Sequence, residues 1–422
     1  MITFDEALDC LLANAVPLGT EQTPLTSSPG RVLAEEIRSD IDMPPFNKSA
    51  VDGFACRRED IGLLEDRDVR ARHAAPTQHA PTSTENTDVR AGHAPSLRVI
   101  ETIPAGAVPR HPIGPYQCAK IMTGAMIPEG ANTVIMVEDT EELSDGTIRI
   151  TKESSSPNIC HKAEDIRKGD PVLAKGILIT PQAIAVLASV GAVNPTVFKQ
   201  PAVAVISTGD ELVEPHEFPC PAMIRNSNSS QLIAQLGQMK LNAIDMGISG
   251  DSKDALYEKI DEGLKRSDVL ILSGGVSMGD YDYVPAIMKE LGIKILFKSV
   301  AVQPGRPTVF GRKGSGFVFG LPGNPVSSFV IFEVLVKPFL YKLMGHDFTP
   351  RLIRLPLAAP IRRRNKTRKA ILPVFIRNGL IFPVDYHGSA HIHSYIHAHG
   401  LIAVETGINE LNQGELHDVR LL

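Results

Sequence analysis

No apolar run in the sequence approaches the ~18 residues that a membrane-spanning helix needs, so no membrane span is predicted. The N-terminus, MITFDEALDC, is acidic and amphipathic and does not resemble a signal or transit peptide. The 422 residues include only five cysteines, which are scattered and form no C-x-x-C pair. This pattern argues against a disulfide framework or a zinc site and favours reduced thiols in a cytoplasmic protein. Tryptophan is absent, which excludes nothing.

An excess of basic residues is also missing. The formal net charge is −5, which argues against a general nucleic-acid binder. Hydrophobic residues make up 43% and charged residues 22% of the chain, as is usual for a soluble globular protein. The length predicts two to four domains, each with a core of its own.

Several local patterns predict how the chain is organised. Residues 1–40 are expected to be helical, because apolar residues recur at helical spacing from Phe4 to Leu12. Segment 57–97 repeats DVRARHA as DVRAGHA and is poor in large apolar residues, which predicts a mobile surface insertion. Short apolar runs between Pro and Gly breaks are typical of a small β domain over 98–152. A later helix is expected to begin at Pro181, with Thr180 as its N-cap.

Residues 201–345 alternate continuous apolar runs with helical patterns. Strands are expected at 202–207, 243–248, 269–273 and 293–297, and helices near 229–240, 252–266 and 283–291. This alternation predicts a doubly wound parallel sheet that helices cover on both faces. Asp251 is expected to cap the second of these helices, with Asp254 at its N3 position. After residue 346 the short strands return, which predicts a small C-terminal β domain.

Ligands of an open parallel sheet bind outside the carboxyl ends of its strands. Four loops, 207–212, 249–252, 273–282 and 321–325, are expected to meet there. Together they carry glycines and acids, namely Gly209, Gly250, Gly274, Gly275, Gly323, Asp210, Glu211, Asp251, Asp280 and Asp282. Carboxylates repel phosphate unless a hard cation such as Mg²⁺ lies between them, so the mixture predicts a phosphorylated ligand held with a metal. The alternative is that these acids only cap helices or turn the chain.

Three further motifs each leave two interpretations open. In LPGNP, residues 321–325, Asn324 and Pro325 begin a helix whose free amides form an anion site, or simply begin a helix. The basic run RRRNKTRK at 362–369 closes an anionic pocket together with Arg306, or is a solvated face. The histidines at 387, 391, 393, 397 and 399 form a surface cluster in preference to a metal site, because no acid or cysteine accompanies them at ligand spacing.

The motifs taken together resemble the molybdopterin molybdenumtransferases, the MoeA/gephyrin E-domain family. The resemblance rests on these stretches, in order: PPFNKSAVDGFA (44–55), KIMTGAMIPEGANTVIMVED (120–139), VISTGDEL (205–212), LSGGVSMGDYDYV (272–284), VQPGRP (302–307), LPGNPVSS (321–328) and HGSAHIHS (387–394). The family architecture implies an α/β multidomain protein. Its parts would be a helical and extended N-terminal domain (1–41 with 153–198), an inserted β domain (42–152), a doubly wound molybdopterin-binding domain (199–346) and a C-terminal β-barrel-like domain (347–422).

The resemblance also implies a reaction and the residues that perform it. Members insert molybdenum from molybdate into adenylylated molybdopterin and release AMP with a divalent cation, usually Mg²⁺. The catalytic residues implied are Asp52, Thr123, Glu211, Asp251 and Asp282, of which Glu211, Asp251 and Asp282 would lie on the metal. The ligand-binding residues implied are Ser273, Gly274, Gly275, Ser277, Arg306, Pro322, Gly323, Asn324, Pro325 and Ser389.

The partners implied are a second copy of the chain, whose pocket Asp52 and Thr123 would reach, a molybdopterin adenylyltransferase and molybdoenzyme apoproteins. Gln303 and Ser299 stand where basic residues are common in the family, so a preference for tungstate over molybdate stays open. Two alternatives remain: an adenylyltransferase-type nucleotide enzyme built on the same molybdopterin-binding domain, and a scaffold protein. The first gives the VDGF and MTGA motifs no role, and the second needs a partner groove that the sequence does not identify.

Overall fold

The computed structural model describes residues 1–61, 96–152, 156–276, 283–385, 388 and 390–422. Within these ranges no helix is both long and apolar enough to cross a bilayer. The chain divides into two compact units, one formed by residues 37–173 and the other by residues 1–36 with 174–422. The predicted division into four domains is finer than this and stays a prediction. Residues 62–95 of the predicted insertion lie outside the described ranges.

The unit of residues 37–173 is built around a six-stranded sheet with the order β7-β4-β6-β5-β9-β8. Its strands are β4 (Gly53–Cys56), β5 (Ser96–Ile103), β6 (Gln117–Ile121), β7 (Thr133–Met136), β8 (Thr140–Glu142) and β9 (Thr147–Ile150). Every residue of β4 is buried, and the strand pairs antiparallel with both β6 and β7. The strands predicted over 98–152 are therefore present.

Short elements complete this unit. Two ladders pair β2 (Ile37–Arg38) with β11 (Pro171–Leu173) and β3 (Lys48–Ser49) with β10 (Ile159–Cys160). Two 3₁₀ turns are η2 (Arg58–Asp60) and η3 (Val137–Asp139).

The larger unit contains the predicted α/β arrangement, in a sheet with the order β16-β13-β17-β21-β20-β18. The strands are β13 (Val203–Thr208), β16 (Ala243–Ser249), β17 (Val269–Ser273), β18 (Lys294–Phe297), β20 (Val309–Lys313) and β21 (Gly316–Leu321). The first four in the sheet are parallel, but β20 runs antiparallel to both neighbours. The four predicted strands all run in one direction, but β20 and β21 were not predicted, and β20 is antiparallel because these two strands form a tight hairpin in which Lys313 pairs with Gly316.

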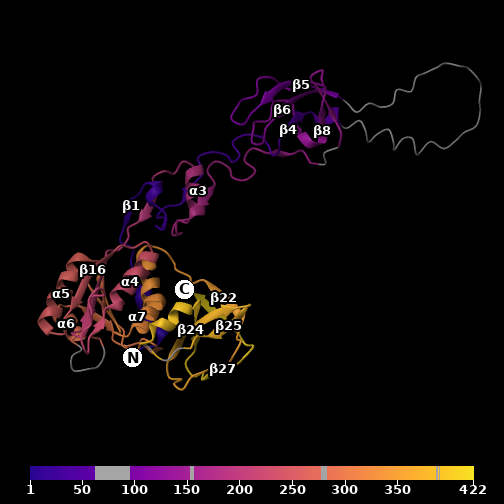
Figure 1. Cartoon of the computed structure of the whole chain (residues 1–422). Helices are drawn as coiled ribbons and strands as arrows, with labels where there is room; N and C mark the ends of the chain where they lie inside the picture. Colours follow the sequence, from indigo (N-terminus) through magenta and orange to yellow (C-terminus); the bar gives the residue numbers. More distant parts are fainter. Residues whose placement is uncertain (62–95, 153–155, 277–282, 386–387, 389) are drawn as a thin grey trace, which may run out of the picture. The chain divides into compact units, whose positions relative to one another are not determined.

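Helices cover both faces of this sheet, as the continuous apolar strands predict (Figure 1). On one face lie α4 (Ser227–Gln238) and α7 (Pro325–Ile331), and on the other α5 (Lys253–Arg266) and α6 (Val284–Glu290). Alternate residues of β13 serve the two faces: Val203 and Val205 join the core of α4, and Ala204 and Ile206 join that of α5. A strand buried on both faces must be apolar throughout, which is the pattern seen in the sequence.

The first helix packs against the end of the α/β part. Helix α7 continues through the π-helical segment η4 (Phe332–Val336) into α8 (Lys337–Leu343), and α1 (Phe4–Asn14) shares their core. Thr3 and Glu6 form a capping box at the start of α1. The helical prediction for residues 1–40 was right for α1 only. Prolines and glycines break up the rest, which forms β1 (Thr20–Gln22) and the 3₁₀ turn η1 (Leu25–Ser27).

Downstream of the first helix, two predictions near residue 180 are confirmed. Helix α3 (Pro181–Ser189) begins with Pro181 at N1, and the Thr180 hydroxyl accepts a hydrogen bond from the Ala183 N–H. Strand β12 (Thr196–Phe198) then pairs with β1.

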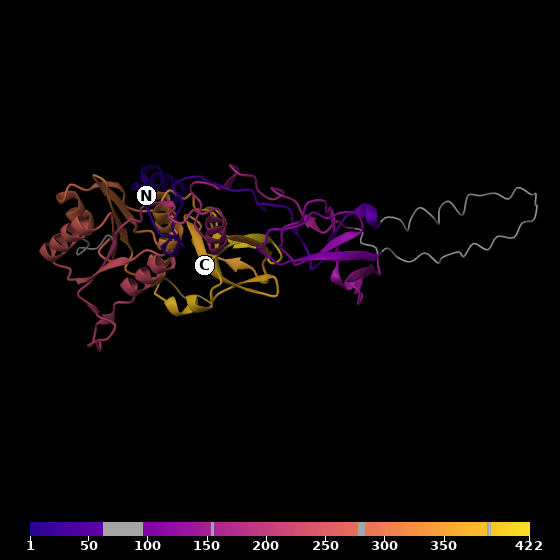
Figure 2. The ribbon, with the colours of Figure 1, turned by 90° about the horizontal axis from the view of Figure 1, so that it is seen from above.

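The C-terminal strands, yellow in Figure 2, form a sheet together with β19, in the order β19-β24-β26-β28-β22, and β25 pairs with β24. The strands are β19 (Val302–Gln303), β22 (Leu352–Pro356), β24 (Lys369–Arg377), β25 (Leu380–Pro383), β26 (Gly400–Val404) and β28 (Leu416–Leu421). A short ladder joins β23 (Ile361–Arg362) to β27 (Glu410–Leu411). Because β19 comes from the α/β part, it ties the two parts of this unit together.

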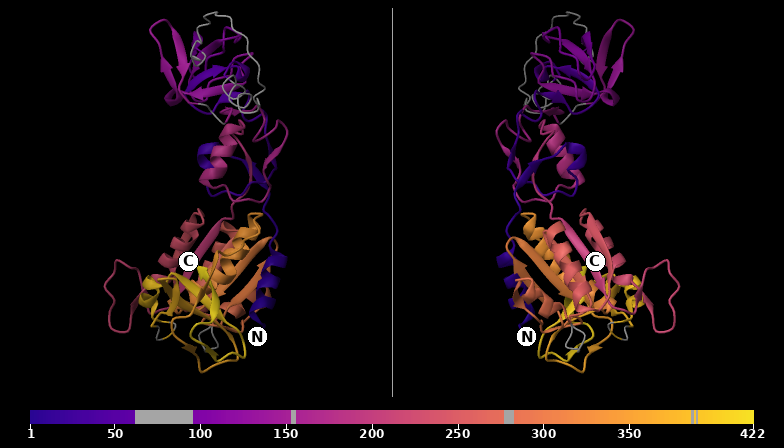
Figure 3. Two further views of the ribbon diagram at one scale, coloured as in Figure 1. Left: turned by 90° about the vertical axis from the view of Figure 1, so that its right-hand side faces the viewer. Right: turned by 90° about the vertical axis from the view of Figure 1, so that its left-hand side faces the viewer.

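One loop of the α/β part projects from its surface (Figure 3). It connects β14 (Leu212–Val213) to β15 (Ile224–Arg225), two short strands that pair in parallel. Phe218, in this loop, is 88% exposed. Because its ring is exposed, Phe218 is a suitable control when a buried phenylalanine is substituted.

We expect Phe310→Ala to lower the free energy of unfolding of the larger unit by about 3–5 kcal/mol. The ring is fully buried in the sheet, with its centroid 4.8 Å from that of Phe319 and 5.4 Å from that of Phe339. Urea unfolding followed by circular dichroism measures the loss. Phe218→Ala is the matched control, with a change within about 0.5 kcal/mol. Equal effects of the two substitutions would contradict the assigned core.

Candidate functional site

Four loops meet at the carboxyl edge of the parallel strands, as the sequence predicts. The Gly209 N–H donates to the Ser249 carbonyl at 3.2 Å, which joins the loops after β13 and β16. The Gly274 N–H donates to the Leu321 carbonyl at 3.0 Å, which joins the loops after β17 and β21. The four loops are therefore linked in two pairs by backbone hydrogen bonds.

Two acids at this edge hold each other's loops. The Asp210 N–H donates to Asp251 Oδ2 at 3.3 Å, and the Asp251 N–H donates to Asp210 Oδ1 at 3.0 Å. Asp251 was predicted to cap α5, and this prediction is wrong. Ser252 caps that helix by accepting from the Ala255 N–H, which places Asp254 at N2 rather than N3. The turn of Asp251 toward Asp210 brings two carboxylates together at the ligand edge.

The glycine loop after β17 admits no larger residue. Gly274 has φ +103°, and a Cβ added there would lie 2.6 Å from both the carbonyl oxygen and Oγ1 of Thr208. Gly275 has φ +65°, and its Cβ would lie 3.1 Å from the same Oγ1. A Cβ on Gly323 would be 3.6 Å from the Gly274 Cα, so these glycines bring the two loops into close approach.

Asn228, which the sequence analysis did not single out, joins two of the predicted ligand loops. It lies in the first turn of α4, and its Nδ2 donates at 2.7 Å to Ser273 Oγ and at 2.7 Å to the Gly323 carbonyl. Ser273 itself is 2% exposed. The only signal in the sequence was the polar run NSNSS at 226–230, which reads as an ordinary helix start.

The remaining ligand loop begins a helix as predicted. Asn324 is the N-cap residue of α7 and Pro325 occupies N1, although the Asn324 side chain does not form a capping bond to this helix. Pro322, Gly323, Asn324 and Pro325 thus lie together beside Gly274 and Ser273. The anion site at this helix start stays a prediction.

Arg306 lies close to a second arginine, Arg368. Its charge is one of the two causes that lower the pKa of Arg368, the larger cause being burial of the Arg368 guanidinium. Most of the basic run 362–369 has structural partners. Arg362 pairs with Glu410 at 2.8 Å, Lys369 pairs with Glu405 at 2.9 Å, and Arg363 donates to backbone carbonyls.

In the other unit the structure brings together Asp52 and Thr123. Asp52 Oδ1 accepts from the Thr123 N–H at 2.6 Å and from the Thr123 hydroxyl at 2.8 Å. These two bonds, the backbone one first, lower the pKa of the exposed Asp52 carboxyl below its ordinary value. Two motifs 71 positions apart therefore form one local acidic feature.

Three predicted site residues, Ser277, Asp282 and Ser389, lie outside the described residues, as do Asp280 and His387. Three histidines of the predicted cluster lie around the 3₁₀ segment η5 (Ile392–His397) and not on one face of a strand. His391 precedes this segment, and His393 and His397 belong to it. Burial raises the pKa of the Cys56 and Cys118 thiols to about 12, which makes them poor nucleophiles.

The residues present fit a metal that is shared with a ligand better than one held by protein alone. No group of three or more His, Cys, Asp or Glu side chains suited to a metal occurs within the described ranges. The donors at the sheet edge are carboxylate oxygens, from Asp210, Glu211 and Asp251. Mg²⁺ in proteins typically takes one or two carboxylates and completes its shell with water and phosphate oxygens.

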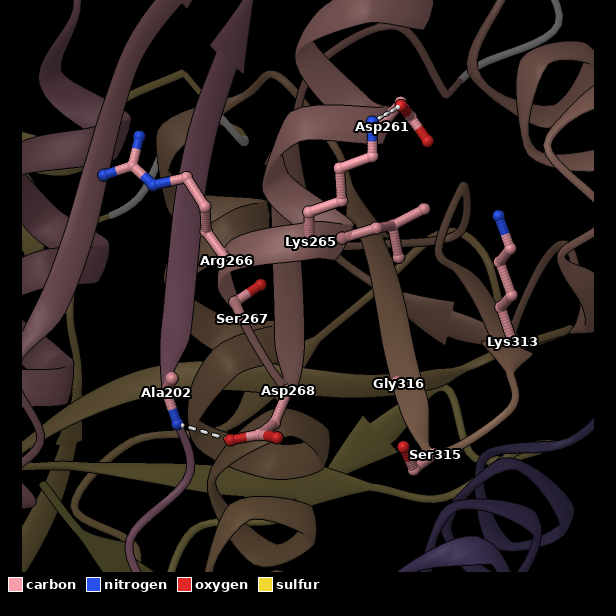
Figure 4. A pocket seen from close by; sticks show the side chains of 10 residues that line it. Ala202, Asp261, Lys265, Arg266, Ser267, Asp268, Lys313, Ser315 and Gly316 are labelled. Atoms are coloured by element: carbon pink, nitrogen blue, oxygen red, sulfur yellow. Dashed lines mark hydrogen bonds and ion pairs between the residues drawn. The ribbon is translucent and has the colours of Figure 1, made fainter.

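A polar hollow of about 530 Å³ lies at the opposite edge of the sheet (Figure 4). It is bordered by Ala202 and Asp268, which precede β13 and β17, and by Gly316, which begins β21. Two of its charged side chains have partners: Lys265 pairs with Asp261 at 2.5 Å, and the Asp268 carboxylate accepts from the Ala202 N–H at 2.8 Å. This hollow is separate from the predicted site.

Comparison with known proteins covers both units. Residues 2–191 match the family described as MoeA N-terminal region (domain I and II), and residues 204–342 match the family described as probable molybdopterin binding domain. A protein of Staphylococcus epidermidis named molybdopterin molybdenumtransferase is 34% identical over all of this chain and 95% of its own length. A protein of Bacillus subtilis with the same name is 37% identical over 79% of this chain and 73% of its own length.

Solved structures agree with the sequence relatives. A crystal structure of a molybdopterin biosynthesis MoeA protein from Pyrococcus horikoshii is 30% identical to this chain, with a TM-score of 0.76, and covers 100% of this chain and 99% of its own. A second structure of a MoeA protein from the same organism is 28% identical, with a TM-score of 0.81 over 100% of both chains.

We expect Thr123→Val to raise the pKa of Asp52 part of the way toward its ordinary value, because the hydroxyl bond is lost and the backbone bond is kept. A depressed carboxyl pKa stabilises the fold at neutral pH, and this stabilisation is lost as the pH falls through the folded-state pKa, below about pH 4. NMR titration of the Asp52 carboxyl measures the shift. Thr147→Val is the matched control, because it removes the same kind of bond from Asp145. An Asp52 pKa unchanged by Thr123→Val would refute the assignment.

Proposed function

This chain belongs to the MoeA family of molybdopterin molybdenumtransferases, and we propose that it transfers molybdenum from molybdate to the dithiolene of adenylylated molybdopterin and releases AMP. Membership makes it a transferase of molybdenum cofactor biosynthesis. The reaction steps, the metal and the assembly are parts of the proposal.

The observation that carries the proposal is the meeting of the four loops on one edge of the sheet. Gly274 and Gly275, which follow Ser273, present a backbone free of side chains, and Pro322 to Pro325 lie beside them. In doubly wound sheets this edge is where nucleotides bind. We propose that these loops, with Ser277, Ser389 and Arg306, hold the phosphates and the pterin of the ligand.

The acids would take the metal. We propose that Glu211, Asp251 and Asp282 hold Mg²⁺ against the pyrophosphate of the ligand, where the ion would stabilise negative charge on the leaving phosphate. The mutual hydrogen bonds of Asp210 and Asp251 support this, because they fix a carboxylate at the sheet edge.

The chain's own residues would hold and orient the reacting groups. The glycine loop would hold the pyrophosphate so that water attacks one phosphorus atom, and the bond to the other phosphate breaks to release AMP. We further propose a cytoplasmic homodimer in which Asp52 and Thr123 of one copy reach the pocket of the other. A molybdopterin adenylyltransferase would supply the substrate, and molybdoenzyme apoproteins would receive the product.

We expect purified protein, mixed with adenylylated molybdopterin, Mg²⁺ and molybdate, to release AMP, and Asp282→Ala to abolish that release because a carboxylate on the metal is lost. Chromatographic AMP measurement gives the rate, and size-exclusion chromatography shows whether the oligomeric state is kept. Asp280→Ala, two positions away, is the matched control and should retain most activity.

Full activity of Asp282→Ala would remove this residue from the mechanism. Adenylylation of molybdopterin by the wild-type protein with ATP, in place of AMP release, would favour the adenylyltransferase alternative. Faster turnover with tungstate than with molybdate would make the chain a tungstate-preferring member of the family.

A further inference from the structure

Two buried polar atoms at the candidate site have no hydrogen-bond partner within the described chain. They are Oγ1 of Thr208, at the end of β13, and Oδ1 of Asn228, in the first turn of α4. Thr208 is 5% exposed. Buried polar groups of native proteins are nearly always paired, so each such atom calls for an explanation, and a ligand is one.

The orientation of the Asn228 amide follows from its partners. The Gly323 carbonyl can only accept a hydrogen bond, so the NH₂ group of Asn228 must face it, at 2.7 Å. The same NH₂ group also donates to Ser273 Oγ, so both hydrogens of the amide are used. Turning the amide over would place two acceptors against each other, so Oδ1 is held as an unpaired acceptor.

The free hydroxyl of Thr208 faces the glycine loop. It lies where a side chain on Gly274 or Gly275 would collide with it, 2.6 Å and 3.1 Å from the two ideal Cβ positions. Ser273 accepts from Asn228, so its own hydroxyl hydrogen remains available to donate. Three polar groups with spare hydrogen-bonding capacity, those of Thr208, Asn228 and Ser273, therefore lie beside the glycine pair Gly274–Gly275.

A fully paired network lies one position away on the same two elements. Ser207 Oγ lies 2.8 Å from Asn226 Oδ1 and 2.8 Å from Ser229 Oγ, and all three residues are buried. Ser207, Asn226 and Ser229 thus pair with one another in the interior. The unpaired atoms belong to the neighbouring residues, Thr208 and Asn228, whose contacts are with the ligand loops.

An unpaired amide oxygen selects a particular part of the ligand. It cannot bond a phosphate oxygen, which is an acceptor itself, and needs an N–H or O–H donor. Resting on the proposed function, where the ligand joins a phosphorylated pterin to adenosine, we propose that Asn228 Oδ1 accepts a hydrogen bond from a donor of its non-phosphate part. The donor is a ring amine or a ribose hydroxyl. Thr208 Oγ1 makes a second bond to the same ligand, so the two residues determine specificity beside the phosphate-holding loop.

Pairing a protein change with a ligand change tests this directly. Wild type, Asn228→Ala, Thr208→Val and the control Ser230→Ala, an exposed residue of the same helix, are titrated calorimetrically with AMP. Purine riboside 5′-monophosphate, which lacks the amine, and 2′-deoxy- and 3′-deoxyadenosine 5′-monophosphate, each of which lacks one ribose hydroxyl, follow. The KM of each variant for adenylylated molybdopterin is also measured, and it tests whether the donor lies on the pterin.

We expect Asn228→Ala to weaken binding roughly 3- to 10-fold for ligands that keep the donor, the size of one neutral hydrogen bond, and by far less for the analogue without it. The analogue that abolishes the difference identifies the donor as amine or hydroxyl. A rise in KM for adenylylated molybdopterin, with AMP binding unchanged, places the donor on the pterin. Ser230→Ala should match wild type throughout.

Thr208→Val keeps the shape of the side chain and removes the unpaired hydroxyl. Its melting temperature should equal or exceed that of wild type while ligand binding weakens, a combination that a purely structural role does not produce. Equal weakening of every ligand by Asn228→Ala, or no change in any of them, would overturn the inference while the proposed function stands. A protein that releases no AMP, in which Asn228→Ala still weakens only the ligands that keep the donor, is a separate outcome. That result would refute the proposed function and leave the inference intact.

Discussion

The one-to-one register of three parallel strands determines where the site lies. Ser207 on β13 pairs with Ser273 on β17, which pairs with Leu321 on β21, so the three strands end in one row across the sheet. These strands are buried on both faces, and a slip by one residue would exchange the side chains of the two cores. The cores therefore fix the register, and the register places the loops at 208–211, 274–276 and 322–325 side by side.

Carboxylates beside a phosphate-type loop are compatible because the two groups use different parts of the chain. The glycine loop offers backbone at Gly274 and Gly275, where left-handed φ angles and a close approach to Thr208 exclude side chains. Asp210 and Asp251 lie on the neighbouring pair of loops and are held by each other's N–H groups. Fixed hydrogen bonds of this kind keep the acids in place before a ligand or an ion arrives, and so reduce the entropy that binding must overcome.

Features encoded locally were predicted well from the sequence. The Thr180–Pro181 start of α3 depends on neighbouring residues only and was found in full. Four strands of the sheet, β13, β16, β17 and β18, were predicted because they form continuous apolar runs, whereas β20 and β21 were not predicted. The antiparallel direction of β20 depends on its hairpin partner β21, and its own sequence does not show it. Asp251 was assigned as a cap because it is a good capping residue next to a better-placed one, Ser252.

The contact that organises the candidate site could not be read from the sequence. Asn228 lies 45 positions from Ser273 and 95 from Gly323, so only the topology reveals that one amide bonds both. Both bonds come from the NH₂ group of Asn228, so this one residue anchors both loops. Neither loop can move away from the other without breaking its bond to Asn228. The loops that follow β17 and β21 are thus coupled through the first turn of α4. That coupling leaves the amide oxygen in a fixed position, and a fixed acceptor discriminates between ligands more strongly than one that can turn to water.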